Sequence, residues 1–104
     1  MKQDNILAML GLAQKAGKVV SGEYAVEKAV KGGSAYLVII AQDASDLTKK
    51  KYRDMTAFYH VPLVTYAAKQ TLGASIGKEL RACAALTDPG FADSIQKKIS
   101  VLQQ

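Results

Sequence analysis

The apolar run AYLVIIA, residues 35–41, constrains the fold of this chain more than any other stretch. A run without charges that is rich in β-branched and aromatic side chains is typical of a strand covered on both faces. Such a strand lies at the centre of a sheet and needs helices above and below it. The run therefore predicts a layered α/β protein.

The remaining segments alternate between helical and extended patterns. In the predicted helices the apolar residues recur three and four positions apart, which gives each helix one buried face. The predicted elements are helices at 4–16, 22–31, 46–59, 69–77 and 89–102 and strands at 18–20, 35–41, 61–66 and 81–87. We therefore expect an α/β fold, a three-layer α/β/α sandwich with a small mixed four-stranded sheet. No linker or repeat interrupts residues 1–104, so we predict a single domain.

Capping residues and buried faces follow from the same patterns. Asp4 is placed to cap the first helix and Gly17 to end it, and Ser45 or Asp46 caps the third. Along the third helix the residues that line up are Thr48, Tyr52, Met55 and Tyr59. Along the last helix the apolar series is Phe91, Ile95, Ile99 and Leu102. We expect both series to face the sheet.

The charge balance favours an anionic partner without proving one. Fourteen Lys and Arg stand against nine Asp and Glu, which gives a formal net charge of +5. A basic protein of this kind attracts phosphate-bearing molecules. A single cysteine, Cys83, fits a reducing compartment, and the amino-terminal apolar stretch is too short for a signal peptide. We expect a cytoplasmic protein.

Few residues could carry catalysis. The chain has one His and one Cys, so a Cys/His pair requires His60 and Cys83 to meet in space. The glycine-containing stretch LGLAQKAGK has neither the Walker spacing nor the dinucleotide-binding motif. Asp43 follows the central strand, where α/β enzymes keep catalytic groups, but alone it is better suited to order the loop that starts the next helix. We predict no enzyme, no cofactor and no metal.

The stretch SGEYAVEKAVKGG, residues 21–33, predicts a short helix that begins at a glycine. Gly22 lacks a Cβ, so another backbone can approach it closely. The first amides of the helix have no partners inside it, and together with the helix dipole they suit a phosphate. Glu23 could satisfy that dipole itself, or it could accept hydrogen bonds from base amino groups.

Lysines surround this helix start in the sequence. Lys28 and Lys31 extend the basic character along one helix face, and Lys15 and Lys18 come from the turn before it. The alternative interpretation is that Gly22 only allows a tight turn and that the lysines form a solvated face.

Three blocks of sequence resemble the ribosomal-protein L-seven-Ae and L-thirty-e family of kink-turn RNA-binding proteins, and most closely its bacterial YlxQ-like branch. The first is the G-x-x-x-x-x-K of Gly22 to Lys28 with AVKGG behind it. The others are LVIIAQDAS at residues 37–45 and VPLVTYAAKQTLGASIG at residues 61–77. The similarity covers roughly residues 5–87.

The resemblance implies a sandwich that grips a sharply bent RNA helix at tandem sheared G·A pairs. In such proteins the start of the second helix enters the widened major groove, and the loop after the V-P strand covers bases flipped out at the bend. Gly22 would permit close backbone approach, and Lys28 would contact a phosphate or a guanine edge. The predicted RNA-binding residues are Lys18, Ser21, Gly22, Glu23, Tyr24, Lys28, Lys31, Thr65, Tyr66 and Ala67.

The sequence departs from the family pattern at both contacts. Archaeal and eukaryotic members typically carry Thr, Asn and Glu where this chain has Glu23, Tyr24 and Ala25. Ala67 and Ala68 replace the usual proline and serine. Tyr66 has two interpretations, an aromatic that stacks on an unpaired base or a strand-end residue packed on the sheet.

The predicted partner is a structured RNA, either a kink-turn or ribosomal RNA, bound by a monomer without a membrane or a small-molecule substrate. Two alternatives stay open. The first is a protein-interaction module that keeps the fold and has weak or lost RNA binding. The second is a methyltransferase-type substrate domain or small enzyme that acts in the sheet's cleft.

Overall fold

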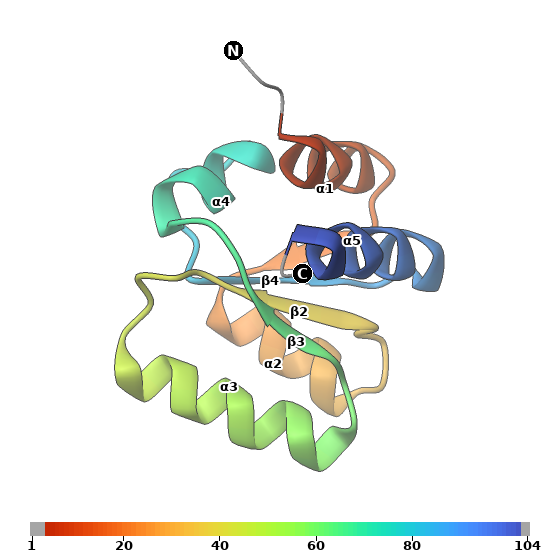
Figure 1. The fold of residues 1–104 in the computed structure, drawn as a ribbon. Coiled ribbons are helices and arrows are strands. Elements are labelled where there is room, and N and C mark those ends of the chain that lie inside the picture. Colours follow the sequence, from red (N-terminus) through yellow and green to blue (C-terminus); the bar gives the residue numbers. More distant parts are fainter. Residues whose placement is uncertain (1–3, 103–104) are drawn as a thin grey trace.

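A computed structural model describes residues 4–102 of the chain, with strands and helices in the predicted order (Figure 1). The helices are α1 (Asn5–Lys15), α2 (Glu23–Lys31), α3 (Asp46–Tyr59), α4 (Lys69–Ser75) and α5 (Pro89–Leu102). The strands are β1 (Val19–Ser21), β2 (Leu37–Ile40), β3 (Leu63–Thr65) and β4 (Cys83–Leu86). None of these helices is long and apolar enough to cross a membrane.

The strands form one mixed four-stranded sheet in the order β1-β4-β2-β3. Strand β4 runs antiparallel to both of its neighbours, and β2 runs parallel to β3. Strand β2 is buried along its whole length, as the run at residues 35–41 predicts. Helices α1, α4 and α5 cover one face of the sheet and α2 and α3 cover the other (Figure 1). The predicted three-layer α/β/α sandwich is confirmed.

Alternate residues of the central strands supply two separate cores. Leu37 and Ile39 point to the side of α1, α4 and α5, and Val38 and Ile40 point to the side of α2 and α3. This alternation is the two-residue period of a strand. Each face of the sheet therefore has its own apolar layer, and both layers fix the positions of the loops at the strand ends.

The ends of the two longest helices overhang the sheet, and two predictions of burial are wrong there. Tyr59 is 39% exposed and Leu102 is 64% exposed, whereas Thr56 is buried and donates its hydroxyl proton to the Tyr52 carbonyl oxygen (2.6 Å). Helices α3 and α5 have 14 residues each, about 21 Å of helix, but the central strands have only four residues, about 13 Å. The last turn of each helix therefore extends past the strands that would cover it.

Candidate nucleic-acid interface

The two predicted RNA contacts lie at the same end of the strands, where β1, β2 and β3 end and β4 begins. Ile40, at the end of β2, pairs with Thr65 on one side and Cys83 on the other. Ser21 ends the outer strand β1, and the next amide, of Gly22, donates to the Cys83 carbonyl oxygen (3.1 Å). The turn at Gly22 and the loop after Thr65 therefore lie at the same end of the sheet but follow its two outer strands. Three strand spacings, about 14 Å, separate them.

Gly22 adopts a backbone conformation that only glycine holds readily. Its φ is 89° and its ψ is 155°, and a Cβ added there would have no heavy atom within 4 Å. The glycine is therefore required by the backbone conformation rather than by a crowded neighbour. It also leaves open space directly beside the first turn of α2.

The first turn of α2 has unpaired backbone donors. No side chain caps this helix, and its first internal hydrogen bond runs from the Val26 amide to the Gly22 carbonyl oxygen (3.0 Å). Within residues 4–102 the amides of Glu23, Tyr24 and Ala25 therefore have no acceptor. Three free N–H groups at the positive end of a helix dipole form a site for a phosphate or carbonyl oxygen.

The side chain of Glu23 is turned towards α3. The Thr48 hydroxyl donates a hydrogen bond to a Glu23 carboxylate oxygen at 3.4 Å and accepts one from the Ser45 hydroxyl (2.9 Å). Tyr24 instead extends into solvent, with 82% of its surface exposed. Tyr24 is therefore the side chain of this first turn that is free to meet a ligand.

The two predicted lysines of α2 differ in their surroundings. Lys28 is exposed and forms no ion pair among the described residues. Lys31 pairs with Glu27 (2.9 Å), which also pairs with Lys51 of α3 (2.7 Å). These hydrogen bonds, from Lys51 first and then Lys31, lower the pKa of Glu27 to about 2. Lys31 is thus occupied by a carboxylate, and Lys28 is not.

Lys15 and Lys18 stand at the other end of β1 from the bare end of α2, so Lys18 as an RNA contact stays a prediction. Both residues precede β1, and Gly22 follows it, so the length of the strand separates them. The Lys18 carbonyl oxygen accepts from the Thr87 amide (2.9 Å) just past the end of β4, at the opposite end of the strands from Gly22. Lys15 and Lys18 are close to Gly22 in the sequence, but the extended strand β1 separates them from it in space.

Arg81 is a basic residue close to Gly22 that the sequence did not reveal. Its Nε donates to the hydroxyl oxygen of Ser21 (3.1 Å) and its Nη1 to the Leu80 carbonyl oxygen (2.8 Å). No carboxylate pairs with it in the part of the chain that the structure describes. The signal that could have found it is the basic loop just before a strand that lies beside β1. We call Ser21–Ala25 together with Lys28 and Arg81 the Gly22 corner.

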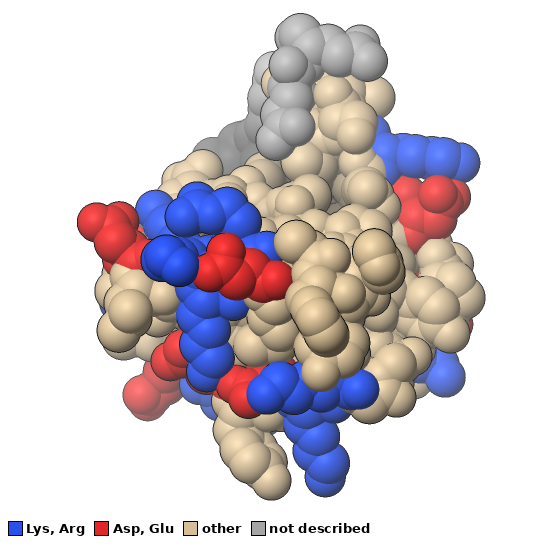
Figure 2. Space-filling view, turned by 90° about the horizontal axis from the view of Figure 1, so that it is seen from below, with Lys and Arg blue, Asp and Glu red and all other residues tan. Residues whose placement is uncertain are grey.

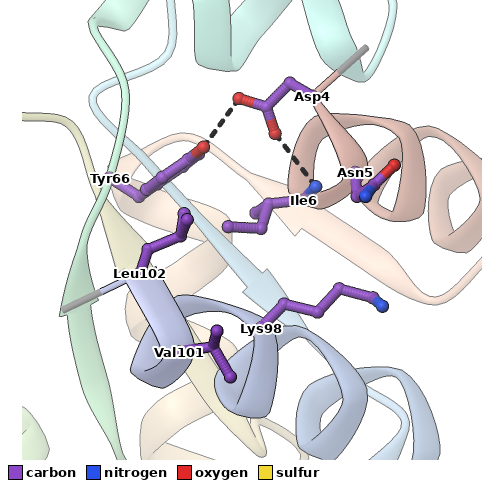
Figure 3. A pocket seen from close by; sticks show the side chains of 7 residues that line it. All are labelled: Asp4, Asn5, Ile6, Tyr66, Lys98, Val101 and Leu102. Atoms are coloured by element: carbon purple, nitrogen blue, oxygen red, sulfur yellow. Dashed lines mark hydrogen bonds between the residues drawn. The ribbon is translucent and has the colours of Figure 1, made fainter. Parts of the chain in front are cut away.

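The loop after β3 is tied to the rest of the protein. The Tyr66 hydroxyl donates to a carboxylate oxygen of Asp4 (2.6 Å), and the ring packs on the core of the α1 side (Figure 3). Ala67 has a φ of 65°, and its carbonyl oxygen accepts from the Gln42 amide (2.7 Å). Tyr66 thus lies on the other face of the sheet from α2, as the strand-end interpretation expects, while Thr65 is exposed.

The bond between Tyr66 and Asp4 shifts both of their pKa values. Burial and the hydrogen bond to the carboxylate raise the pKa of Tyr66 to about 12. Burial alone would raise the pKa of Asp4, but the Tyr66 hydroxyl and the amides of Leu7 and Ile6 outweigh it and lower the pKa. Asp4 therefore caps α1, as predicted, and also anchors the loop after β3.

Charge alone does not single out one region of the face formed by α2 and α3. Lys and Arg side chains are interleaved with Asp and Glu on one side of this face, and a broad uncharged area covers the other (Figure 2). The pair between Lys50 and Asp54 (2.8 Å) is one of these contacts. What distinguishes the Gly22 corner is that its backbone donors and its cations both lack partners in the described part of the chain.

The residues considered for catalysis do not form a site. His60 precedes the start of β3, which runs parallel to β2, and Cys83 pairs with the last residue of β2, so they lie at opposite ends of the strands. Burial raises the pKa of the Cys83 thiol to about 11. Asp43 accepts from the Lys69 amide (2.8 Å) and so orders the start of α4, where we had expected it to order α3. No three metal-ligating side chains gather within residues 4–102.

Comparison with known proteins decides the family. The model of the ribosomal protein L7Ae/L30e/S12e/Gadd45 family matches residues 4–96. The chain belongs to this family. The resemblance inferred from the three sequence blocks is confirmed, and so is its YlxQ-like branch. RNA-binding protein YlxQ of Bacillus subtilis (strain 168) is 46% identical over 87 residues, which cover 84% of this chain and 87% of that protein.

Two solved structures share the fold of this chain. A Bacillus halodurans protein of unknown function superposes with a TM-score of 0.91 at 37% identity, covering 94% of this chain and 99% of that one. The Giardia lamblia 15.5kD RNA binding protein has a TM-score of 0.78 at 22% identity, covering 98% and 93%. The second likeness concerns the fold alone.

Proposed function

We propose that this protein binds structured RNA through the Gly22 corner. The observation that carries the proposal is the first turn of α2, where three backbone amides have no acceptor among residues 4–102 beside a glycine that leaves open space. Unpaired donors at a helix start bind oxyanions. The family relative from Bacillus subtilis is named an RNA-binding protein, which agrees with this assignment.

We further propose that the RNA is sharply bent, as in a kink-turn. A straight A-form helix has a deep, narrow major groove that side chains cannot read. A bend at sheared G·A pairs widens that groove, and the missing Cβ of Gly22 allows backbone to approach base edges there. Arg81 is bonded to Ser21, the residue before Gly22, and Lys28 follows the free amides on α2, so we expect both to contact phosphates near the bend.

Tyr24 and Ala25 set the kind of recognition we expect. The positions that carry an amide and a carboxylate in typical archaeal and eukaryotic relatives hold a phenol and a methyl group here. The backbone donors and the cations are therefore the main contacts, and the exposed ring of Tyr24 stacks on an unpaired base. We expect weaker discrimination among bases than in those relatives and a strong dependence of affinity on salt.

The test is a titration of the protein against two RNA duplexes. One duplex contains a kink-turn, and the other is the same duplex with its G·A pairs restored to Watson–Crick pairs. Tighter binding to the kinked RNA supports the proposal, and the slope of log affinity against log salt counts the phosphate contacts. Equal, weak binding to both contradicts recognition of a bend. A stable protein partner captured after nuclease treatment, with no RNA affinity, would favour a protein-interaction module.

Association with the ribosome, a monomeric state and a cytoplasmic location remain predictions. Identification of the RNAs that co-purify with the protein from cells, together with its sedimentation relative to ribosomal subunits, tests the first of them.

A further inference from the structure

The start of α2 is held in place by a buried tyrosine from another helix. Tyr52 of α3 is fully buried, and its hydroxyl donates to the carbonyl oxygen of Glu23 at 2.7 Å. Burial raises the pKa of Tyr52, so the phenol keeps its proton at neutral pH. Glu23 is the first residue of α2 and follows Gly22 directly. The hydroxyl thus reaches the turn that has the free amides.

This contact takes the place of an ordinary helix cap. Helix α1 is fixed at its start by Asp4, and α3 by Ser45, each through a side chain that accepts from the first-turn amides. Helix α2 has no such cap from any residue that the structure describes. Its first residue is instead held from the α3 side, by Tyr52 at the backbone and by Thr48 at the side chain. The amides stay free while the turn itself is anchored.

We propose that Tyr52, assisted by Thr48, positions the amino end of α2 for RNA binding. The inference rests on the proposed function of the Gly22 corner. Hydrogen bonds weaken steeply as the donor angle falls, so free amides are useful only if the turn that carries them has a fixed direction. A cap on the amides would fix that direction but would occupy the donors. An anchor on the carbonyl oxygen fixes the turn and leaves the donors available.

Packing alone does not explain the phenol. A buried tyrosine hydroxyl needs a hydrogen-bond partner, and a phenylalanine would fill the same apolar space without that requirement. The Glu23 carbonyl oxygen is 29 positions away in sequence, so the bond joins two helices rather than stabilising one. The same helix supplies a matched comparison. The hydroxyl of Thr56 is also buried, but it donates to Tyr52 and Arg53 carbonyl oxygens within α3.

The experiment compares Tyr52→Phe with Thr56→Val in the full chain. Both lose a buried hydroxyl from α3, and only the first loses a contact to α2. We expect Tyr52→Phe to bind the kink-turn duplex about three- to tenfold more weakly than wild type, the effect of one net hydrogen bond. Thr56→Val should keep wild-type affinity. The salt slope should be unchanged in both variants, since no phosphate contact is lost.

A second readout follows the anchor directly. The Val26 amide closes the first turn of α2 by donating to the Gly22 carbonyl oxygen. Its hydrogen exchange should accelerate in Tyr52→Phe and stay at the wild-type rate in Thr56→Val, with the exchange of α5 amides unchanged in both. A merely structural loss would accelerate exchange throughout the protein.

The outcomes separate this inference from the proposed function. If wild type does not distinguish the two duplexes, the proposed function fails and takes the inference with it. If wild type distinguishes them and Tyr52→Phe binds equally well, or if Thr56→Val loses as much affinity, the positioning role is wrong and the proposed function stands. Should Tyr52→Phe not fold, Thr48→Val loosens Glu23 from the same helix at a partly exposed site, and unchanged affinity in it contradicts the inference.

Discussion

The Gly22 corner and the loop Thr65–Ala68 lie at the same end of the strands, and both were expected to contact RNA. Their polar groups are used in opposite ways. The corner leaves three amides without acceptors among the described residues, and Lys28 and Arg81 without carboxylates. The loop uses its groups internally, through Tyr66 with Asp4 and through the Ala67 carbonyl oxygen with the Gln42 amide.

The difference shows that a position at this end of the strands does not by itself make a segment part of an RNA interface. A group that already has a protein partner must give that partner up before it binds a ligand, and the lost bond offsets the gain. Free groups have only water to exchange. On this ground we expect RNA affinity to depend strongly on the corner and weakly on the loop.

The largest expected effect is that of Gly22→Ala. The φ of 89° and ψ of 155° suit almost only glycine, so the substitution should lower the free energy of unfolding by up to about 3 kcal/mol. It should also weaken binding of the kinked duplex. Urea unfolding and RNA titration measure the two effects. Gly33→Ala, at another open glycine with a φ of 81°, should also cost stability but should leave affinity unchanged.

Lys28→Ala should affect binding and not folding. Because Lys28 has no carboxylate partner within residues 4–102, its loss leaves the free energy of unfolding nearly unchanged. Binding of the kinked duplex should weaken by about 2 kcal/mol if the contact is to a base edge. The charge-matched control is Lys97→Ala in α5, which pairs with Asp93 (3.0 Å). Equal losses in the two variants would mean that only net charge matters.

Tyr66→Phe should do the reverse. Loss of the bond to Asp4 is expected to lower the free energy of unfolding by about 1 kcal/mol, with RNA affinity unchanged. The pKa of Asp4 is lowered in the folded protein, so its stabilisation is complete above the unfolded value of 3.8 and is lost as the pH falls through the folded value. Urea unfolding at pH 7 and pH 2 should show the variant's deficit shrinking at low pH. A marked loss of RNA affinity would return Tyr66 to the interface.

Ala67→Gly has the smallest expected effect. Ala67 has a φ of 65°, which costs an L-residue free energy that glycine avoids, partly offset by the greater freedom of glycine in the unfolded chain. We expect a gain of about 0.5 kcal/mol in the free energy of unfolding, measured by urea titration. Ala74→Gly, within the following helix α4, should lower stability instead. Unaltered RNA affinity in both would agree with a loop that serves the fold.

Much of the fold could be predicted because its signals are local. The β-branched run at residues 35–41 identified the central strand, and the caps Asp4 and Ser45 marked two helix starts within their own first turns. The errors occurred where a helix outlasts its strand, at Tyr59 and Leu102. Periodicity reports which residues share a face, but it does not report how far the neighbouring element extends.

The sequence by itself determined the order of the elements, the two-sided burial of β2, the glycine at the start of α2 and the family. Only the tertiary structure decided which polar groups stay free. It paired both Lys31 and Lys51 with Glu27, joined Tyr66 to Asp4 across 62 positions, and placed Lys18 at the opposite end of β1 from Gly22. The physical reason is that propensity and periodicity act between neighbours along the chain, whereas the pairing of charges and hydrogen bonds depends on distances that exist only once the sheet has assembled.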